Sequence, residues 1–238
     1  MFDKSFLQAY SELRHFFAQL CALKISLDRG CLMAKPPPIV QDAPEVIRFE
    51  DLKQRGIPVM FIDSMLPGHQ RMNYALLGDT ASENPEFSPM ITSPHSFQLG
   101  MAMCPPGQGP AYHTHDYIEC FFVLKGAFRF WYGNDPEEEP TKYVDLGPWD
   151  TISIPVGLWR RFENISDEPG WYYAVLEKHE VFESKDPYWA GPLVRQAEEI
   201  GFYADDKGKM IKPNNFEELE QQMNEKLEAY ISDDPAND

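Results

Sequence analysis

Two segments of the chain have the apolar spacing of amphipathic helices. In residues 2–27, the apolar positions recur at spacings of four, three, four and three, which places them on one helical face: Phe6, Tyr10, Leu13, Phe17 and Leu20. In residues 215–231, Asn215 stands three positions before Glu218, which is typical of a capping box, and apolar residues then follow on one face. The pattern therefore predicts a helix near each end of the chain.

The first of these segments has two interpretations. Met33 is followed by Ala-Lys-Pro-Pro-Pro, which resembles an ordinary start followed by a stiff extended arm. Residues 1–32 are then either a docking helix or an over-extended reading frame, and both interpretations stay open. Asp3 and Glu12 argue against a mitochondrial presequence, and the apolar positions are too interrupted for a secretory signal.

The middle of the chain alternates short apolar runs with turn residues. Residues 33–89 contain two such runs, 59–62 and 74–77, among Pro, Gly, Asn and Asp, which predicts an arm carrying a strand or two. Residues 90–183 contain aromatic and β-branched runs at 97–103, 111–115, 118–124, 127–132, 151–154, 159–164 and 171–177. Strands at this spacing predict an antiparallel sandwich or barrel. Residues 184–238 form a C-terminal extension that includes the second helix.

Composition narrows the possible partners. The 238 residues include 21 Lys and Arg against 38 Asp and Glu, a formal net charge of −17. A field of this sign repels phosphate backbones and anionic lipid, so we expect neither a nucleic-acid nor a membrane partner. The 4 cysteines are scattered and contain no CxxC pair, which favours reduced thiols in a cytoplasmic protein.

Three potential metal ligands lie close together in the predicted barrel. His113 and His115 are two residues apart, so in a strand both imidazoles project from one face. Glu119 follows after a tight turn around Asp116 and a return on the neighbouring strand. Two imidazoles and a carboxylate on one side of an ion leave coordination positions open, which suits Fe(II) and oxygen chemistry and also accepts Mn, Ni, Co or Zn. The structural alternative is an exposed histidine pair without a ligand.

The residues around these histidines resemble two motifs of the cupin superfamily. Gly, five residues, HxH, three residues, Glu, six residues and Gly form the first motif, which is complete here in Gly107, His113, His115, Glu119 and Gly126. The second motif, PxGxxH followed by Asn, is similar to Pro155, Gly157 and Asn164. The resemblance covers about residues 97–180. It implies a mainly β fold, a double-stranded β-helix (jelly-roll) barrel that holds a metal inside its mouth through His113, His115 and Glu119.

One position departs from the second motif. Arg160 stands where the family has a third histidine, and a guanidinium has only donors and cannot coordinate a cation. Either the metal is held by the other three residues and Arg160 binds an anionic group of the substrate, or Arg160 pairs with Glu119 in a metal-free binding pocket. Seven residues also separate Gly147 from Pro155, where the family has five.

The resemblance implies an enzyme that acts on a small organic acid or carbonyl compound. Oxygenase chemistry is the first choice, because a three-ligand site leaves room for both substrate and dioxygen. Cupins also include isomerases, decarboxylases and lyases, and the fold does not discriminate among them. The alternative is a non-catalytic cupin that binds a small ligand, with Arg160 in place of a metal ligand. Because cupin barrels commonly pair, we also expect a homodimer.

Overall fold

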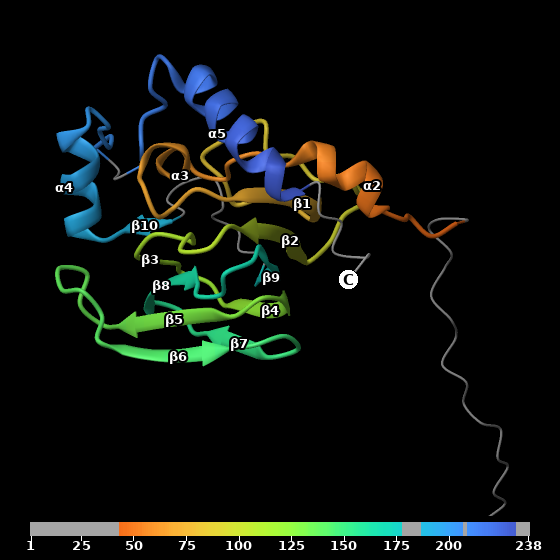
Figure 1. Ribbon diagram of the computed structural model, residues 1–238, viewed down its shortest axis with the longest axis horizontal. Helices are drawn as coiled ribbons and strands as arrows, with labels where there is room; N and C mark the ends of the chain where they lie inside the picture. Colours follow the sequence, from red (N-terminus) through yellow and green to blue (C-terminus); the bar gives the residue numbers. More distant parts are fainter. Residues whose placement is uncertain (1–42, 178–186, 207–208, 232–238) are drawn as a thin grey trace, which may run out of the picture. The chain divides into compact units, whose positions relative to one another are not determined.

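Within residues 43–177, 187–206 and 209–231, which the computed structural model describes, ten strands form two five-stranded antiparallel sheets (Figure 1). The first sheet has the order β1 (Met72–Leu77), β2 (Phe97–Cys104), β9 (Gly170–Glu177), β4 (Glu119–Lys125) and β7 (Thr151–Ile154). The second has the order β10 (Tyr188–Trp189), β3 (His113–Thr114), β8 (Trp159–Asn164), β5 (Phe128–Gly133) and β6 (Lys142–Leu146). The chain passes repeatedly from one sheet to the other, which makes the mainly β jelly-roll that the sequence predicts.

Alternating burial along the strands creates the core between the sheets. In β4 and β8 every second side chain is buried, which is the pattern of a strand with one face toward a core. The Phe130 and Phe162 rings stack with their centroids 4.2 Å apart, and Phe121 meets Phe162 edge-on at 4.7 Å. Phe128 and Phe130 are both buried in this layer. This aromatic layer closes the barrel below the site.

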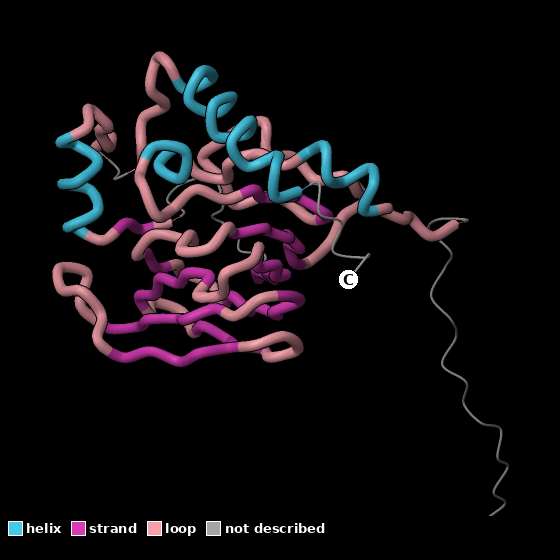
Figure 2. The backbone as a smooth tube through the Cα atoms, in the orientation of Figure 1, coloured by secondary structure: helices cyan, strands magenta, loops and turns pink. Residues whose placement is uncertain are grey.

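Helices cover the outside of the first sheet and one end of the barrel (Figure 2). They are α2 (Phe49–Leu52), the 3-10 helix η1 (Lys53–Arg55), α3 (Phe61–Met65), α4 (Gly191–Glu199) and α5 (Phe216–Ile231). Helix α5 confirms the predicted helix over residues 215–231. Its buried face, Met223, Leu227 and Ile231, packs in one cluster with Met72 and Tyr74 of β1. The apolar face of this helix is therefore covered by its own barrel.

Two sequence expectations differ from the structure, and a third falls outside the described residues. The run at 74–77 belongs to β1, which pairs with β2 as a full member of the first sheet, whereas the run at 59–62 leads into α3 instead of a strand. Strand β6 was not expected, because four of its five side chains are exposed and leave no apolar alternation to detect. Residues 1–42 lie outside the described part of the chain, as does His179, so the predicted N-terminal helix stays a prediction.

The glycine and asparagine positions of the two motifs have a local structural cause. Gly107 and Gly126 both adopt positive φ, at 70° and 78°, which a side chain would strain. Asn164 is fully buried, and its Nδ2 donates to the carbonyls of Cys104 at 2.9 Å and Glu168 at 2.6 Å. Since the Gly107 N–H in turn donates to the Asn164 carbonyl at 2.8 Å, both motifs are joined by one set of hydrogen bonds.

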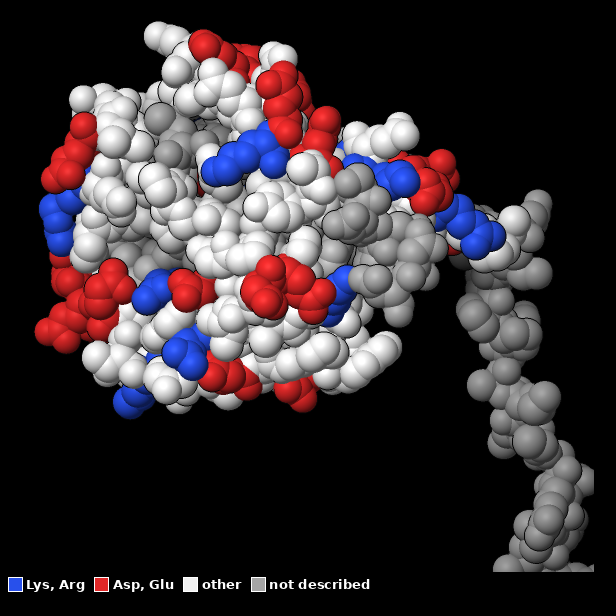
Figure 3. All heavy atoms as spheres, in the orientation of Figure 1, with Lys and Arg blue, Asp and Glu red and all other residues white. Residues whose placement is uncertain are grey.

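Charged side chains on the described surface are mixed. On the face drawn in Figure 3, the Lys and Arg side chains lie singly or in small groups between acidic ones. None of the described helices has the length and hydropathy needed to cross a membrane.

Candidate metal centre

The three predicted ligands come together, but from both sheets. His113 lies on β3, between β10 and β8, and His115 follows just after that strand. Glu119 begins β4, which pairs with β7 and β9 in the other sheet. The expectation that Glu119 returns on a strand next to the histidines is therefore wrong. The turn around Asp116 carries the chain from one sheet to the other, and the carboxylate faces the imidazoles across the mouth of the barrel.

The geometry of this cluster suits a cation. One potential ligand atom from each of His113, His115 and Glu119 lies within 4.8 Å of the others, and His115 Nε2 is 3.8 Å from Glu119 Oε2. All three residues are buried, with exposed fractions of 5 to 7 %. Two ligand atoms on one ion, each bonded at about 2.1 Å, are typically about 3 Å apart, so a small inward movement would complete the site.

Neighbouring groups orient both imidazoles, and those around His113 also set its protonation. His113 Nδ1 lies 2.6 Å from the Ala111 carbonyl, which can only accept, so Nδ1 donates and Nε2 presents its lone pair. Burial, reinforced by the Arg160 guanidinium, holds the pKa of His113 well below its usual range. The His115 ring stacks on Tyr117 with a centroid distance of 4.6 Å. Neutral, oriented imidazoles are the form that binds metal ions.

Arg160 lies beside the histidines, at the position of the family's third histidine, and contacts the Glu119 carboxylate. It is directly opposite His113 in the pairing of β3 with β8, so both side chains share a face. Its Nη2 donates to Glu119 Oε2 at 2.5 Å, and only 1 % of the residue is exposed. This is the pairing that the second interpretation of the sequence predicts. A carboxylate accepts several interactions through its two oxygens, so the ion pair and a metal are compatible. The substrate-binding role of Arg160 stays a prediction.

The three residues line one end of a buried cavity of about 80 Å³. Most of its wall is apolar and includes Met101, Phe121, Ala174 and Leu176. A wider pocket of about 660 Å³ lies beside it and shares His115, Pro187 and Trp189 with it. The inner cavity therefore provides a mostly apolar space next to the ligand cluster, and the shared residues form the boundary with the outer pocket.

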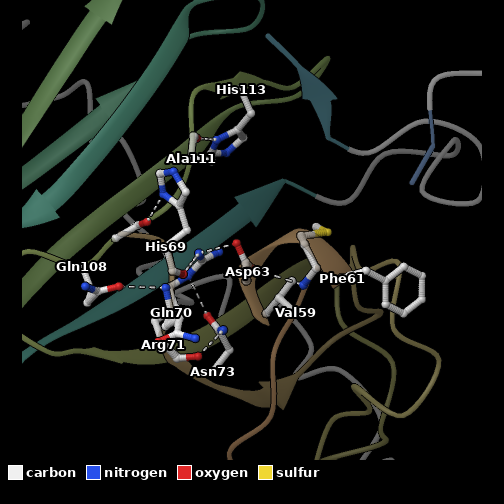
Figure 4. A network of polar contacts seen from close by, with 12 residues as sticks. Val59, Phe61, Asp63, His69, Gln70, Arg71, Asn73, Gln108, Ala111 and His113 are labelled. Atoms are coloured by element: carbon white, nitrogen blue, oxygen red, sulfur yellow. Dashed lines mark hydrogen bonds and ion pairs between the residues drawn. The ribbon is translucent and has the colours of Figure 1, made fainter. Parts of the chain in front are cut away.

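Sequence reasoning missed the polar residues that face this cavity from β1 and its approach. Arg71 and Asn73 line it, and Arg71 pairs with the buried Asp63 at 2.8 Å (Figure 4). Burial lowers the pKa of Arg71, but the Asp63 carboxylate more than offsets this and raises it. Arg71 and Asn73 are two residues apart in an apolar stretch, and this spacing was the available signal.

The other described histidines and Cys120 do not belong to the cluster. His69 Nδ1 lies 3.0 Å from the Gly109 carbonyl, and His95 Nδ1 lies 2.7 Å from the Ser93 carbonyl. Cys120 is a half-buried free thiol of opposite parity to Glu119, and the cavity lining does not include it. His15 and His179 fall outside the described residues.

The comparisons identify the domain. The family model of the cupin domain matches residues 100–176. A cupin 2 conserved barrel domain protein from Salinispora arenicola is 15 % identical with a TM-score of 0.40, over 67 % of this chain and 99 % of that one. A cupin superfamily protein from Desulfitobacterium hafniense is 10 % identical with a TM-score of 0.34. The match covers 46 % of this chain and 79 % of that one. The cupin domain of Schizosaccharomyces pombe Cnp3 is 16 % identical with a TM-score of 0.34. The match covers 49 % of this chain and 67 % of that one. No curated protein matches the chain in sequence.

Proposed function

Residues 100–176 of this chain are a cupin domain, and from this premise we propose that the protein is a metal-dependent enzyme acting on a small organic acid or carbonyl compound. His113, His115 and Glu119 hold the divalent ion, with Fe(II) as first choice and Mn, Ni, Co or Zn as alternatives. The observation that carries the proposal is the convergence of these three buried donors within 4.8 Å in the lining of a mostly apolar cavity.

The donor set fits a reactive metal better than a structural one. Structural zinc sites in proteins are closed by four protein ligands, whereas this site offers three and adjoins a cavity. When bound, the ion supplies Lewis acidity to an oxygen atom of the ligand and, for iron, redox chemistry with dioxygen. Oxygenase activity is therefore the reaction class that we propose first.

The protein residues have separate tasks in this proposal. Ala111, through its carbonyl, keeps the His113 lone pair on Nε2, and Tyr117 holds the plane of His115. Arg160 orients the Glu119 carboxylate through the 2.5 Å contact. The apolar wall excludes water around the ligand, which strengthens every electrostatic interaction inside the cavity.

Metal analysis of purified variants tests the proposal. We expect about one equivalent of metal in the wild type after dialysis against each candidate ion. His113→Ala and His115→Ala should lose it while keeping the circular dichroism spectrum of a folded barrel, because two protein donors are left. His95→Ala is the matched control, since His95 lies outside the cluster. Unchanged metal content in both site variants would show that the histidines are bystanders.

The Arg160–Glu119 ion pair favours a second candidate, a non-catalytic cupin that binds a small ligand without metal. In this alternative the guanidinium takes the place of the missing histidine and balances the carboxylate permanently. Metal-free wild-type protein after exposure to all five ions, combined with a thermal shift by a small-molecule ligand, would support the alternative over the enzyme.

A further inference from the structure

We infer that Arg71 binds the carboxylate of the ligand in the inner cavity, so that the ligand is a short carboxylic acid. The cavity places this guanidinium and the three potential metal ligands in one lining. The inference rests on the proposed function for the ligand's approach to the metal. The residue that it assigns to carboxylate binding, however, lies outside both cupin motifs.

Arg71 is held in one orientation by its neighbours. Its Nη1 donates to Asp63 Oδ1 at 2.8 Å and to the His69 carbonyl at 3.4 Å, and its Nε donates to Asn73 Oδ1 at 3.3 Å (Figure 4). Asp63 is itself fixed, because its Oδ2 accepts the Met60 N–H at 3.2 Å at the start of α3. A guanidinium fixed in this way loses little conformational entropy when a ligand binds.

One nitrogen of Arg71 is left for a ligand. Among the described residues, Nη2 has no hydrogen-bond partner, although only 6 % of Arg71 is exposed. Because Arg71 lines the cavity, a ligand oxygen there can accept from Nη2. A charged donor that the protein leaves without an acceptor gains most from an anionic oxygen.

The charges around the cavity also call for an anion. Asp63 with Arg71, and Glu119 with Arg160, are two buried pairs of opposite formal charge, so together they sum to zero. A divalent ion held by Glu119 and two neutral imidazoles would add two positive charges in a buried place. A ligand carboxylate would offset one of these two charges, which favours an anionic ligand over a neutral one.

Size and polarity limit the ligand further. A cavity of about 80 Å³ holds on the order of five or six water-sized groups. Gln98 adds a neutral donor, because its Oε1 already accepts the Ala81 N–H at 2.7 Å and its amide NH₂ is the remaining polar group. Acids of two to three carbons, such as acetate, lactate and pyruvate, have this size.

Matched acid and amide pairs test the inference without changing the protein. We propose titration calorimetry of the wild type with acetate and acetamide, lactate and lactamide, and pyruvate and pyruvamide, with and without bound metal. At least one acid should bind tenfold or more tightly than its amide. If no acid exceeds its amide, the inference is overturned.

Variants then assign the preference to Arg71. The double variant Arg71→Gln/Asp63→Asn removes both charges and leaves no isolated buried carboxylate, so it is expected to fold; it should lose the preference by tenfold or more. Arg71→Lys should recover part of it, and Arg161→Gln, on the adjacent outward position of β8, should leave it unchanged. A double variant that keeps the acid preference overturns the inference.

Metal content separates this inference from the proposed function. If the double variant loses the acid preference but retains metal, both stand. If the wild type binds no metal but still prefers acids through Arg71, the enzyme proposal fails and the assignment of Arg71 stands. If the wild type retains metal but its acid preference does not depend on Arg71, the assignment of Arg71 fails and the enzyme proposal stands.

Discussion

Replacing Arg160 with histidine separates the two roles that the fold allows for this position. In the structure, the buried guanidinium balances the Glu119 carboxylate at 2.5 Å, with 1 % and 6 % of the two residues exposed. Removing one partner of such a pair costs about 3–5 kcal/mol, because it leaves a buried charge without its counterpart. We therefore expect metal-free Arg160→His to unfold on the order of 10 °C below the wild type, given about 2–4 °C per kcal/mol for a domain of this size.

Metal should reverse this loss. A divalent ion replaces the lost positive charge beside Glu119, and the new imidazole at residue 160 lies directly opposite His113, where it can complete a four-ligand set. Any ligand that binds only the folded state raises its stability by mass action. The rise in melting temperature on adding Zn or Mn should thus be larger for Arg160→His than for the wild type, and the metal affinity should be tighter.

The assay is differential scanning fluorimetry with metal titration, combined with metal analysis after dialysis. Arg161→His is the matched control, since Arg161 is the next residue of β8 and packs outward over Trp131 at 3.9 Å. It should change neither quantity. Unchanged apo-protein stability together with unchanged metal affinity in Arg160→His would refute both the buried ion pair and the alignment of the second motif.

Three further predictions concern Glu83, Asn164 and the oligomeric state. Burial raises the pKa of Glu83 to about 7, so this folded-state pKa exceeds its value of 4.5 in the unfolded chain and stability falls as pH rises from about 4.5 to about 7. At about 1.4 kcal/mol per pKa unit, the free energy of unfolding should drop by roughly 3 kcal/mol more for the wild type than for Glu83→Gln between pH 4 and pH 8 in urea titrations, and parallel curves would contradict this. Asn164→Ala should lose about 2–3 kcal/mol in the same assay, because two carbonyls lose their donor; a loss below 0.5 kcal/mol would show that these hydrogen bonds contribute little. Light scattering should give about 55 kDa, twice the 27.4 kDa of one chain, and a mass near one chain at micromolar concentration would exclude the predicted homodimer.

The C-terminal helix does not supply a surface for the predicted dimer. Helix α5 buries Met223, Leu227 and Ile231 against its own barrel. The prediction of a homodimer rests on the observation that cupin barrels commonly pair. Exposed aromatic residues at the sheet margin, such as Tyr143 and Trp149, offer apolar surface for such contact.

Local patterns in the sequence were sufficient for the barrel and for the ligand cluster. Seven strands could be predicted because short aromatic and β-branched runs alternate with turn residues. In strands with one face toward the core, such as β4 and β8, the alternation of side chains also records the fold directly. The HxH spacing placed two imidazoles on one face, and the motif glycines marked turns with positive φ. Strand β6 escaped prediction for the same reason, since its exposed side chains carry no such record.

Only the tertiary structure decided which distant groups meet. Nothing local connects Glu119 with Arg160, 41 residues later, and their pairing follows from the packing of β4 in one sheet against β8 in the other. Arg71 likewise joins the cavity because β1 becomes an edge strand of the first sheet, although its sequence reads as part of an arm. Sequence periodicity reports which face of a strand is buried, whereas the identity of the groups across the cavity depends on how the two sheets pack, and the chemistry of this site lies between them.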